Sequence, residues 1–163
     1  MIIDYEKNLI YLHWVSRKKS SSYQHEMLTD TSAYYTSSIE LKDARIMVRS
    51  EVAGKKMRLI IDSGAETNIL DSRLPDNVFD EVMINSRIVL TGIGDKKVEA
   101  LRGNLSRITI GGQRVENLPV LITNLEKTCF SYGGCVDGVL GFDFLSLKKI
   151  GFNFVKRKMY IWK

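Results

Sequence analysis

From residue 39 onward the chain is a series of short apolar runs separated by tight turns, and this pattern constrains the fold most. The runs are 44–52, 56–61, 87–90, 98–101, 105–110, 114–115, 120–122, 138–140, 150–154 and 159–162. Turn-forming sequences such as Ala53-Gly54-Lys55 and Gly111-Gly112-Gln113 separate neighbouring runs, as in β-hairpins. Only 76–84 and 142–147 favour short helices. We therefore expect a mostly β fold, either a sandwich or a small barrel.

Composition excludes several classes of protein. The chain has 163 residues, 44% apolar and 26% charged, so it has enough apolar surface to fold as one domain. No apolar run approaches the roughly 20 residues that a membrane-spanning helix needs. The net charge is +5, but the basic cluster Arg17-Lys18-Lys19 lacks stacking aromatic residues. We expect a solvated linker there, and no nucleic-acid partner.

The N-terminal part divides into two segments. Residues 1–15 predict a β-hairpin extension, and 16–38 predict a linker or arm because this stretch is basic and serine-rich and lacks periodicity. The sequence of 3–12 resembles that of 152–161, since both read as an apolar strand, a basic turn and an apolar strand with Tyr. Two amphipathic hairpins can match by chance. The alternative is that the first hairpin is the tail of a preceding lobe.

Neither the cysteines nor the N-terminal residues determine the cellular compartment of the protein. Asp4 and Lys7 interrupt the apolar N-terminus, which therefore does not read as a signal peptide. The default expectation is a cytoplasmic protein, or an exported one if a signal has been removed. Cys129 and Cys135 either form a disulfide or stay as two free thiols. We expect no metal site, because the chain has only two histidines and no second pair of ligands.

The chemically informative segment is Ile60-Ile61-Asp62-Ser63-Gly64-Ala65, an apolar strand that delivers an aspartate to a turn. A carboxylate at the end of a buried strand is costly unless hydrogen bonds hold it. Ser63 offers a hydroxyl group, and Gly64 allows close backbone approach and leaves room beside the carboxylate. Alone, an Asp-Ser-Gly triplet is weak evidence, because these residues are also common in turns.

Two further segments follow in a fixed order. Thr91-Gly92-Ile93-Gly94 forms the tip of a long hairpin, and Val139-Leu140-Gly141-Phe142-Asp143-Phe144-Leu145 leads from a strand into a helix. With the Asp62 segment, this ordered set resembles the retropepsin-like aspartic protease family. The stretch 108–120 is also similar to bacterial members, and the resemblance covers about 40–162.

The resemblance implies that 39–163 form a retropepsin-like aspartic protease domain, a small closed β-barrel with one or two short helices. It implies an aspartic endopeptidase that acts on polypeptides without a cofactor. The implied roles are as follows: Asp62 is catalytic; Ser63, Gly64 and Ala65 form the active-site loop; Gly92, Ile93 and Gly94 form a flap that binds substrate; Val139, Leu140 and Gly141 support the site. Asp143 is expected to be structural.

The mechanism of this family needs two aspartates that face each other and share one proton. This chain supplies one, because the other candidate, Asp30-Thr31-Ser32-Ala33, lacks the glycine. We therefore expect a homodimer in which Asp62 meets its copy. The alternatives are a weak or inactive peptide-binding or protein-binding domain, and one lobe of a longer tandem protease. Glu66 and the charged flap residues Asp95-Lys96-Lys97 depart from the pattern of viral members.

Overall fold

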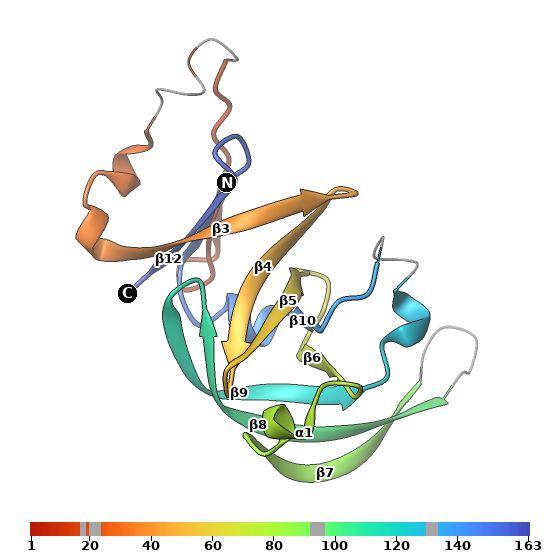
Figure 1. The fold of residues 1–163 in the computed structure, drawn as a ribbon. Coiled ribbons are helices and arrows are strands. Elements are labelled where there is room, and N and C mark those ends of the chain that lie inside the picture. Colours follow the sequence, from red (N-terminus) through yellow and green to blue (C-terminus); the bar gives the residue numbers. More distant parts are fainter. Residues whose placement is uncertain (17–18, 20–23, 92–96, 130–133) are drawn as a thin grey trace.

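A computed structural model describes residues 1–16, 19, 24–91, 97–129 and 134–163 (Figure 1). Strands dominate it, which confirms the expected mostly β class. The strands are β1 (Ile2–Asp4), β2 (Leu9–Tyr11), β3 (Tyr34–Lys42), β4 (Arg45–Val52), β5 (Lys55–Ile61), β6 (Asn68–Asp71), β7 (Val82–Thr91), β8 (Lys97–Ile110), β9 (Gln113–Thr123), β10 (Gly138–Leu140), β11 (Ile150–Asn153) and β12 (Lys158–Trp162). The helices are α1 (Asp76–Phe79) and α2 (Phe142–Leu145), with short 3-10 turns η1 (Glu26–Leu28), η2 (Thr31–Ala33) and η3 (Glu126–Thr128).

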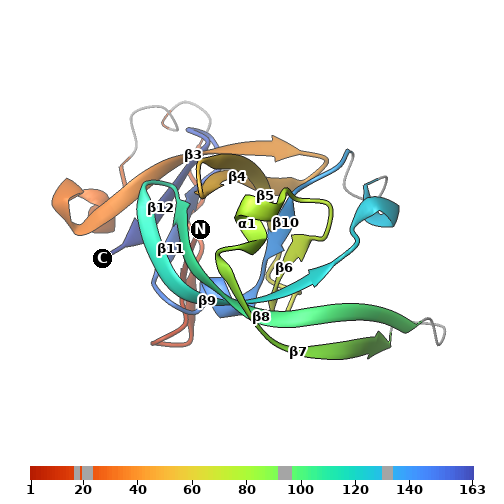
Figure 2. The ribbon, with the colours of Figure 1, turned by 60° about the horizontal axis from the view of Figure 1, so that its bottom comes forward.

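In the described residues, the strands form one twelve-stranded sheet in the order β2-β1-β11-β12-β3-β4-β5-β10-β6-β9-β8-β7. The sheet folds back on itself, because β4 also pairs with β8 at Ser50↔Ile110 and Glu51↔Thr109. Figure 2 shows β10 between β5 and β6, near the middle of the molecule. β10 is parallel to β5 and antiparallel to β6. This central position places Leu140 and the residues that follow it beside the end of β5, because Leu140 pairs with Ile61.

Several elements have bounds that differ from those expected. The runs 98–101 and 105–110 belong to the single strand β8, which continues through Gly103. A Cβ at Gly103 would lie 2.6 Å from the Met83 carbonyl oxygen. Glycine here therefore marks the close approach of β7 and β8 rather than a turn.

The helix expected at 76–84 ends much earlier, because α1 ends at Phe79 and β7 begins at Val82. Residues 82–84 instead pair with β8, and Val82 is buried opposite Leu105. The expected helix at 142–147 is likewise the single turn α2, ending at Leu145. At 82–84, strand pairing and the burial of Val82 outweigh a local preference for helix.

The N-terminal hairpin is present as β1 and β2, which pair at Ile2↔Tyr11 and Ile3↔Ile10. The segment expected to be a linker or arm, 16–38, contains η1 and η2 and then the first residues of β3. β3 begins at Tyr34 rather than at residue 39, because residues 34–38 pair with β12 along its whole length. This pairing joins the C-terminal hairpin to the rest of the sheet.

The core is apolar and is shared by most of the strands. Leu59, Leu105 and Ile110 are fully buried, and Phe144 of α2 packs into the same cluster. Outside the core, Cys129 and Cys135 form a disulfide, the first of the two alternatives considered for them. No helix among the described residues is long and apolar enough to cross a membrane.

Candidate active site

Asp62 follows β5 directly, at the point where the strand ends beside β10. Its backbone N–H donates to the Leu140 carbonyl oxygen at 3.0 Å, which extends the pairing of β5 with β10 by one residue. The Gly64 N–H donates to Oδ1 of the Asp62 carboxylate at 2.9 Å. The Ala65 N–H donates to the Asp62 carbonyl oxygen at 3.2 Å and closes the turn. The loop thereby fixes a half-buried carboxylate at the end of a rigid strand.

Gly64 and Ser63 are exposed beside this carboxylate. A Cβ on Gly64 would lie 3.2 Å from Oδ1 of Asp62, which is closer than ordinary van der Waals contact. A side chain at this position would therefore crowd the carboxylate. The structure agrees with the expectation that Gly64 leaves room beside Asp62.

The segment Val139-Leu140-Gly141 lies behind the Asp62 loop. Val139 and Leu140 are buried and pair with Ile60 and Ile61. A Cβ on Gly141 would lie 2.5 Å from the Ala65 carbonyl oxygen and 2.6 Å from that of Thr67. Only glycine allows the two segments to approach this closely.

Two further residues, which the sequence analysis did not single out, tie the loop to its surroundings. Asn68 is 1% exposed; its Oδ1 accepts from the Gly141 N–H and its Nδ2 donates to the Pro119 carbonyl oxygen, both at 2.9 Å. Thr67 Oγ1 donates to Asp143 Oδ2 at 2.6 Å, in keeping with a structural role for Asp143. In the sequence, Asn68 stands out only as a polar residue that directly precedes the apolar pair Ile69-Leu70.

Asp71, at the end of β6, is a second buried carboxylate near this framework. It is 4% exposed, and its oxygens accept from the Arg73 side chain at 3.0 Å and from the Arg73 and Leu125 backbone N–H groups. Burial acts to raise the pKa of this carboxyl, but the hydrogen bonds and the Arg73 charge outweigh it and hold the pKa below its usual value. Asp71 is therefore charged and structural.

Replacing Asp71 with Asn is expected to lower the free energy of unfolding by about 1.5–3 kcal/mol at pH 7, because hydrogen bonds to a charged group are lost. A lowered folded-state pKa stabilises the protein above the unfolded value of about 4, and this stability is lost as pH falls through the folded value. The difference between wild type and variant should therefore shrink below about pH 4. Urea unfolding of both proteins from pH 3 to 7 measures this difference in the free energy of unfolding. The exposed Asp80→Asn should change little, and an equal Asp71→Asn effect at every pH would contradict this interpretation.

The expected flap residues Gly92, Ile93 and Gly94 lie outside the described residues, and so do Asp95 and Lys96, whereas Lys97 is the first residue of β8. The strands that lead to them, β7 and β8, are described and pair as far as Thr91↔Lys97. The structure thus brings together Asp62, its loop and the Val139–Gly141 segment. Among the described residues, no three His, Cys, Asp or Glu side chains gather in a way that could hold a metal ion.

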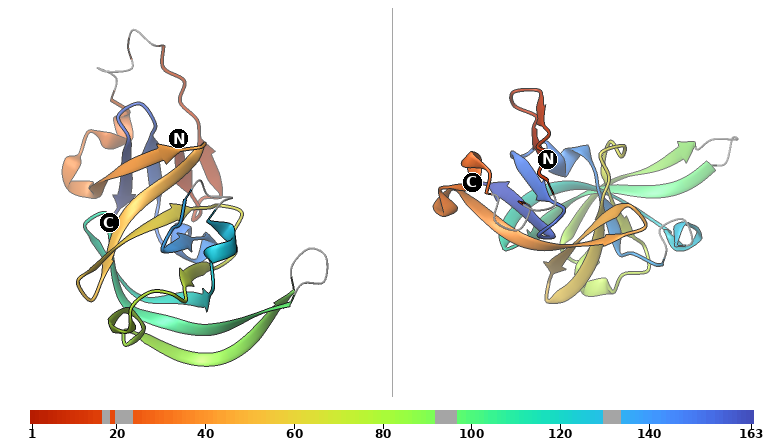
Figure 3. Two further views of the ribbon diagram at one scale, coloured as in Figure 1. Left: turned by 45° about the vertical axis from the view of Figure 1, so that its right-hand side comes forward. Right: turned by 90° about the horizontal axis from the view of Figure 1, so that it is seen from above.

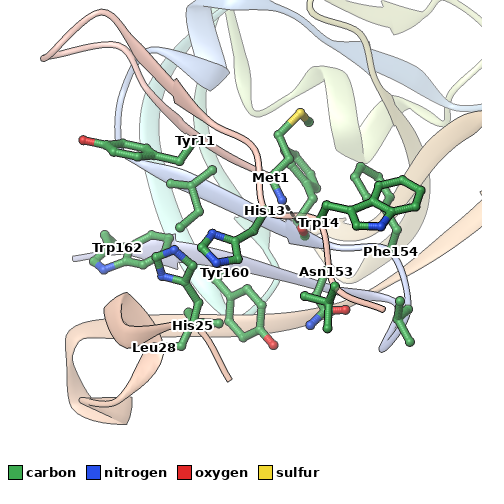
Figure 4. Close-up of a pocket in the computed structure, with 14 residues that line it drawn as sticks. Met1, Tyr11, His13, Trp14, His25, Leu28, Asn153, Phe154, Tyr160 and Trp162 are labelled. Carbon is green, nitrogen blue, oxygen red and sulfur yellow. Dashed lines mark hydrogen bonds between the residues drawn. The ribbon is translucent and has the colours of Figure 1, made fainter. Parts of the chain in front are cut away.

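A large apolar pocket lies elsewhere in the molecule, between the N-terminal hairpin, the arm and the C-terminal hairpin (Figure 4). Its volume is about 570 Å³, and its lining includes Trp14, Phe154 and Trp162. The rings of His13 and His25 meet edge to face at 4.7 Å in this region. No residue of the Asp62 loop lines the pocket, so it is separate from the candidate site.

Comparison with known proteins gives two findings. The family model described as "Aspartyl protease" matches residues 48–144, more than half of the chain and the whole of the site framework. Among solved structures, a retropepsin-like aspartic protease from Rickettsia conorii is 18% identical and matches with a TM-score of 0.46, over 78% of this chain and 89% of that chain. A search of curated proteins finds no match.

Proposed function

The chain belongs to the aspartyl protease family, and from this premise we propose that it is an aspartic endopeptidase with Asp62 as a catalytic carboxylate. The observation that supports this best is the position of Asp62. It follows a buried strand, its Oδ1 accepts from the Gly64 N–H, and it remains half-buried rather than enclosed. A carboxylate held in this way is oriented before substrate arrives, which lowers the reorganisation that catalysis needs.

The proposed reaction uses two carboxylates that share one proton, because two adjacent negative charges cannot both persist. The ionised carboxylate removes a proton from a water molecule, and the oxygen of that water attacks the scissile carbonyl carbon. The protonated carboxyl donates its proton to the carbonyl oxygen. One proton then passes to the amide nitrogen, the C–N bond breaks, and a carboxylic acid and an amine leave. No cofactor takes part.

The other site residues have supporting roles in this proposal. Ser63 bonds to the loop of the partner lobe, Gly64 contacts the substrate backbone, and Ala65 completes the loop. Gly92, Ile93 and Gly94 close over an extended peptide and exclude water. Val139, Leu140 and Gly141 hold the loop from behind. The closed barrel of retropepsin-like type, which the sequence analysis expected, stays a prediction.

The second carboxylate has to come from another lobe, and the proposed source is Asp62 of a second copy in a two-fold symmetric homodimer. The experiment combines light scattering with cleavage of a mixed peptide library at pH 4–6. We expect activity that is inhibited by a pepstatin-like compound and whose specific value rises with protein concentration in step with dimer formation. Activity that is independent of concentration in a protein that remains monomeric would contradict this proposal.

One observation supports a second candidate function, a binding domain with little catalysis. The chain has only one Asp-Ser-Gly triplet. A lone lobe of this kind could hold an extended peptide along its strands without cleaving it. Peptide binding that Asp62→Asn leaves unchanged, in a protein without measurable cleavage at any concentration, would favour this function.

A further inference from the structure

The N-terminal hairpin β1–β2 and the C-terminal hairpin β11–β12 have the same geometry. The pairs Ile2↔Tyr11, Ile3↔Ile10 and Asp4↔Leu9 of the first hairpin correspond to Gly151↔Tyr160, Phe152↔Met159 and Asn153↔Lys158 of the second. Each residue of the first hairpin therefore matches the residue 149 positions later. The similarity seen in the sequence extends to the register of every pair.

The turns of the two hairpins also match. Each has four residues, and the last of them, Asn8 or Arg157, has a positive φ of 54° or 49°. The side chain that ends the first strand caps the turn in both. Asp4 Oδ1 accepts from the Lys7 N–H at 3.1 Å, and Asn153 Oδ1 accepts from the Lys156 N–H at 2.8 Å. A chance match of two amphipathic hairpins does not require this shared cap.

The two hairpins are related to each other by a local two-fold axis. β1 pairs with β11 in antiparallel fashion, and Ile2 lies opposite Gly151, its own equivalent. Ile3 lies opposite Ile150, and the equivalent pair, Met1 and Phe152, exchanges two backbone hydrogen bonds of 3.0 and 2.7 Å. The four strands β2-β1-β11-β12 thus resemble the junction of two symmetric lobes.

The surroundings of the two hairpins differ, however. Met159 and Ile161 of β12 are 0% and 1% exposed, whereas their equivalents Ile10 and Leu12 are 63% and 77% exposed. β12 pairs with β3, but β2 is the edge of the sheet. In the right-hand view of Figure 3 the N-terminal hairpin extends beyond the rest of the molecule. Among the described residues, the lobe covers the C-terminal hairpin on one side of the axis, whereas Ile10 and Leu12 of the N-terminal hairpin stay exposed on the other side.

We propose that residues 1–12 are the C-terminal hairpin of a second lobe of the same fold, and that this lobe docks on the edge of β2 and covers Ile10 and Leu12. One strand of the lobe pairs with β2 as β3 pairs with β12. The lobe brings a second Asp-Ser-Gly loop, and this part of the inference rests on the proposed function. In the homodimer of the single chain proposed above, β11–β12 of the second copy has to displace residues 1–12 from β11, where Ile2, Ile3 and Asp4 are buried, so the single chain pairs less tightly than two lobes joined through residues 1–12.

The test builds the missing lobe from the chain itself. Residues 34–149 are placed directly before Met1 of the full chain, so that residues 1–12 follow them as 150–161 do in the original. In a control tandem, two full chains are joined by a flexible Gly/Ser linker, so that each lobe keeps its own terminal hairpin. Ile10→Cys reports accessibility by its rate of maleimide labelling, and Met83→Cys, 65% exposed on β7, is the matched control.

We expect the labelling of Ile10→Cys to slow at least about 100-fold in the direct tandem relative to the single chain, because the new lobe buries this position. Labelling should stay fast in the control tandem and at Met83→Cys in the original lobe. Fast labelling of Ile10→Cys in a folded direct tandem would overturn the proposal. So would a direct tandem that does not fold although the control tandem folds, since residues 1–12 would then not complete a lobe.

Cleavage assays on the same proteins separate this inference from the proposed function. A protected Ile10→Cys without any cleavage would support the docking of the lobe and count against the protease. Cleavage by the single chain, with Ile10→Cys still fast to label in the direct tandem, would support the protease and overturn the docking. If both proposals hold, the direct tandem cleaves at dilutions where the single chain does not.

Discussion

Replacing Asp62 with Asn should reduce kcat by about 10³- to 10⁴-fold, because an amide can neither take a proton from water nor return one to the leaving amine. The assay is peptide cleavage at pH 4–6, with the protein at a concentration where wild type is fully active. Asp43→Asn is the matched control. Asp43 is exposed in the β3–β4 turn and has a positive φ of 49°, a conformation that asparagine tolerates well.

The fold should survive this substitution. Oδ1 of Asp62 accepts from the Gly64 N–H, and the oxygen of an asparagine can accept the same hydrogen bond. Urea unfolding of Asp62→Asn should therefore match wild type to within about 1 kcal/mol. Loss of activity with retained stability would assign Asp62 to the chemistry. A folded variant that cleaves as fast as wild type would remove Asp62 from the mechanism.

Replacing Gly141 with Ala should have the largest effect on stability. The new methyl group would lie 2.5 and 2.6 Å from the backbone oxygens of Ala65 and Thr67. These oxygens belong to the backbone that follows Asp62 and cannot move aside as a flexible side chain can. We expect the free energy of unfolding to fall by about 3 kcal/mol, at the upper end of the cost of overpacking, and activity to fall with it because the loop shifts.

Gly112→Ala separates this clash from the general cost of replacing a glycine. Gly112 has a φ of 83°, and a Cβ there would meet nothing within 4 Å. Its substitution should cost about 1–2 kcal/mol through backbone strain alone, and it should leave activity unchanged. Urea unfolding measures both variants. If Gly141→Ala is no more destabilising than Gly112→Ala, the close packing behind the Asp62 loop does not support the site.

Much of this architecture could be predicted because it depends on local sequence. The alternation of apolar runs and turns indicated a mostly β fold, and the three ordered motifs indicated the family that the match over 48–144 supports. The apolar residues before Asp62 and before Gly141 predicted two buried strands. These strands, β5 and β10, are neighbours in the sheet.

The features that could not be predicted depend on contacts between distant segments. Gly103 looks like a turn residue, but it lies within β8 because β7 passes close to it. Asn68 is an ordinary polar residue in the sequence, yet it joins Gly141 to Pro119, which lie far from it along the chain. The bare face of Ile10 and Leu12 could be recognised only by comparison with the buried Met159 and Ile161.

The central claim is that each active site contains two carboxylates, Asp62 and the equivalent aspartate of a second lobe, which for the single chain is Asp62 of a second copy. A mixing experiment with the single chain tests it most directly. Wild-type protein is equilibrated with a large excess of Asp62→Asn at a concentration where dimers form, and peptide cleavage is then measured. If the claim is right, most wild-type chains pair with the variant, each mixed site keeps one aspartate, and activity falls towards zero as the excess grows. Activity that stays proportional to the amount of wild-type chain, whatever the excess of variant, would contradict the claim.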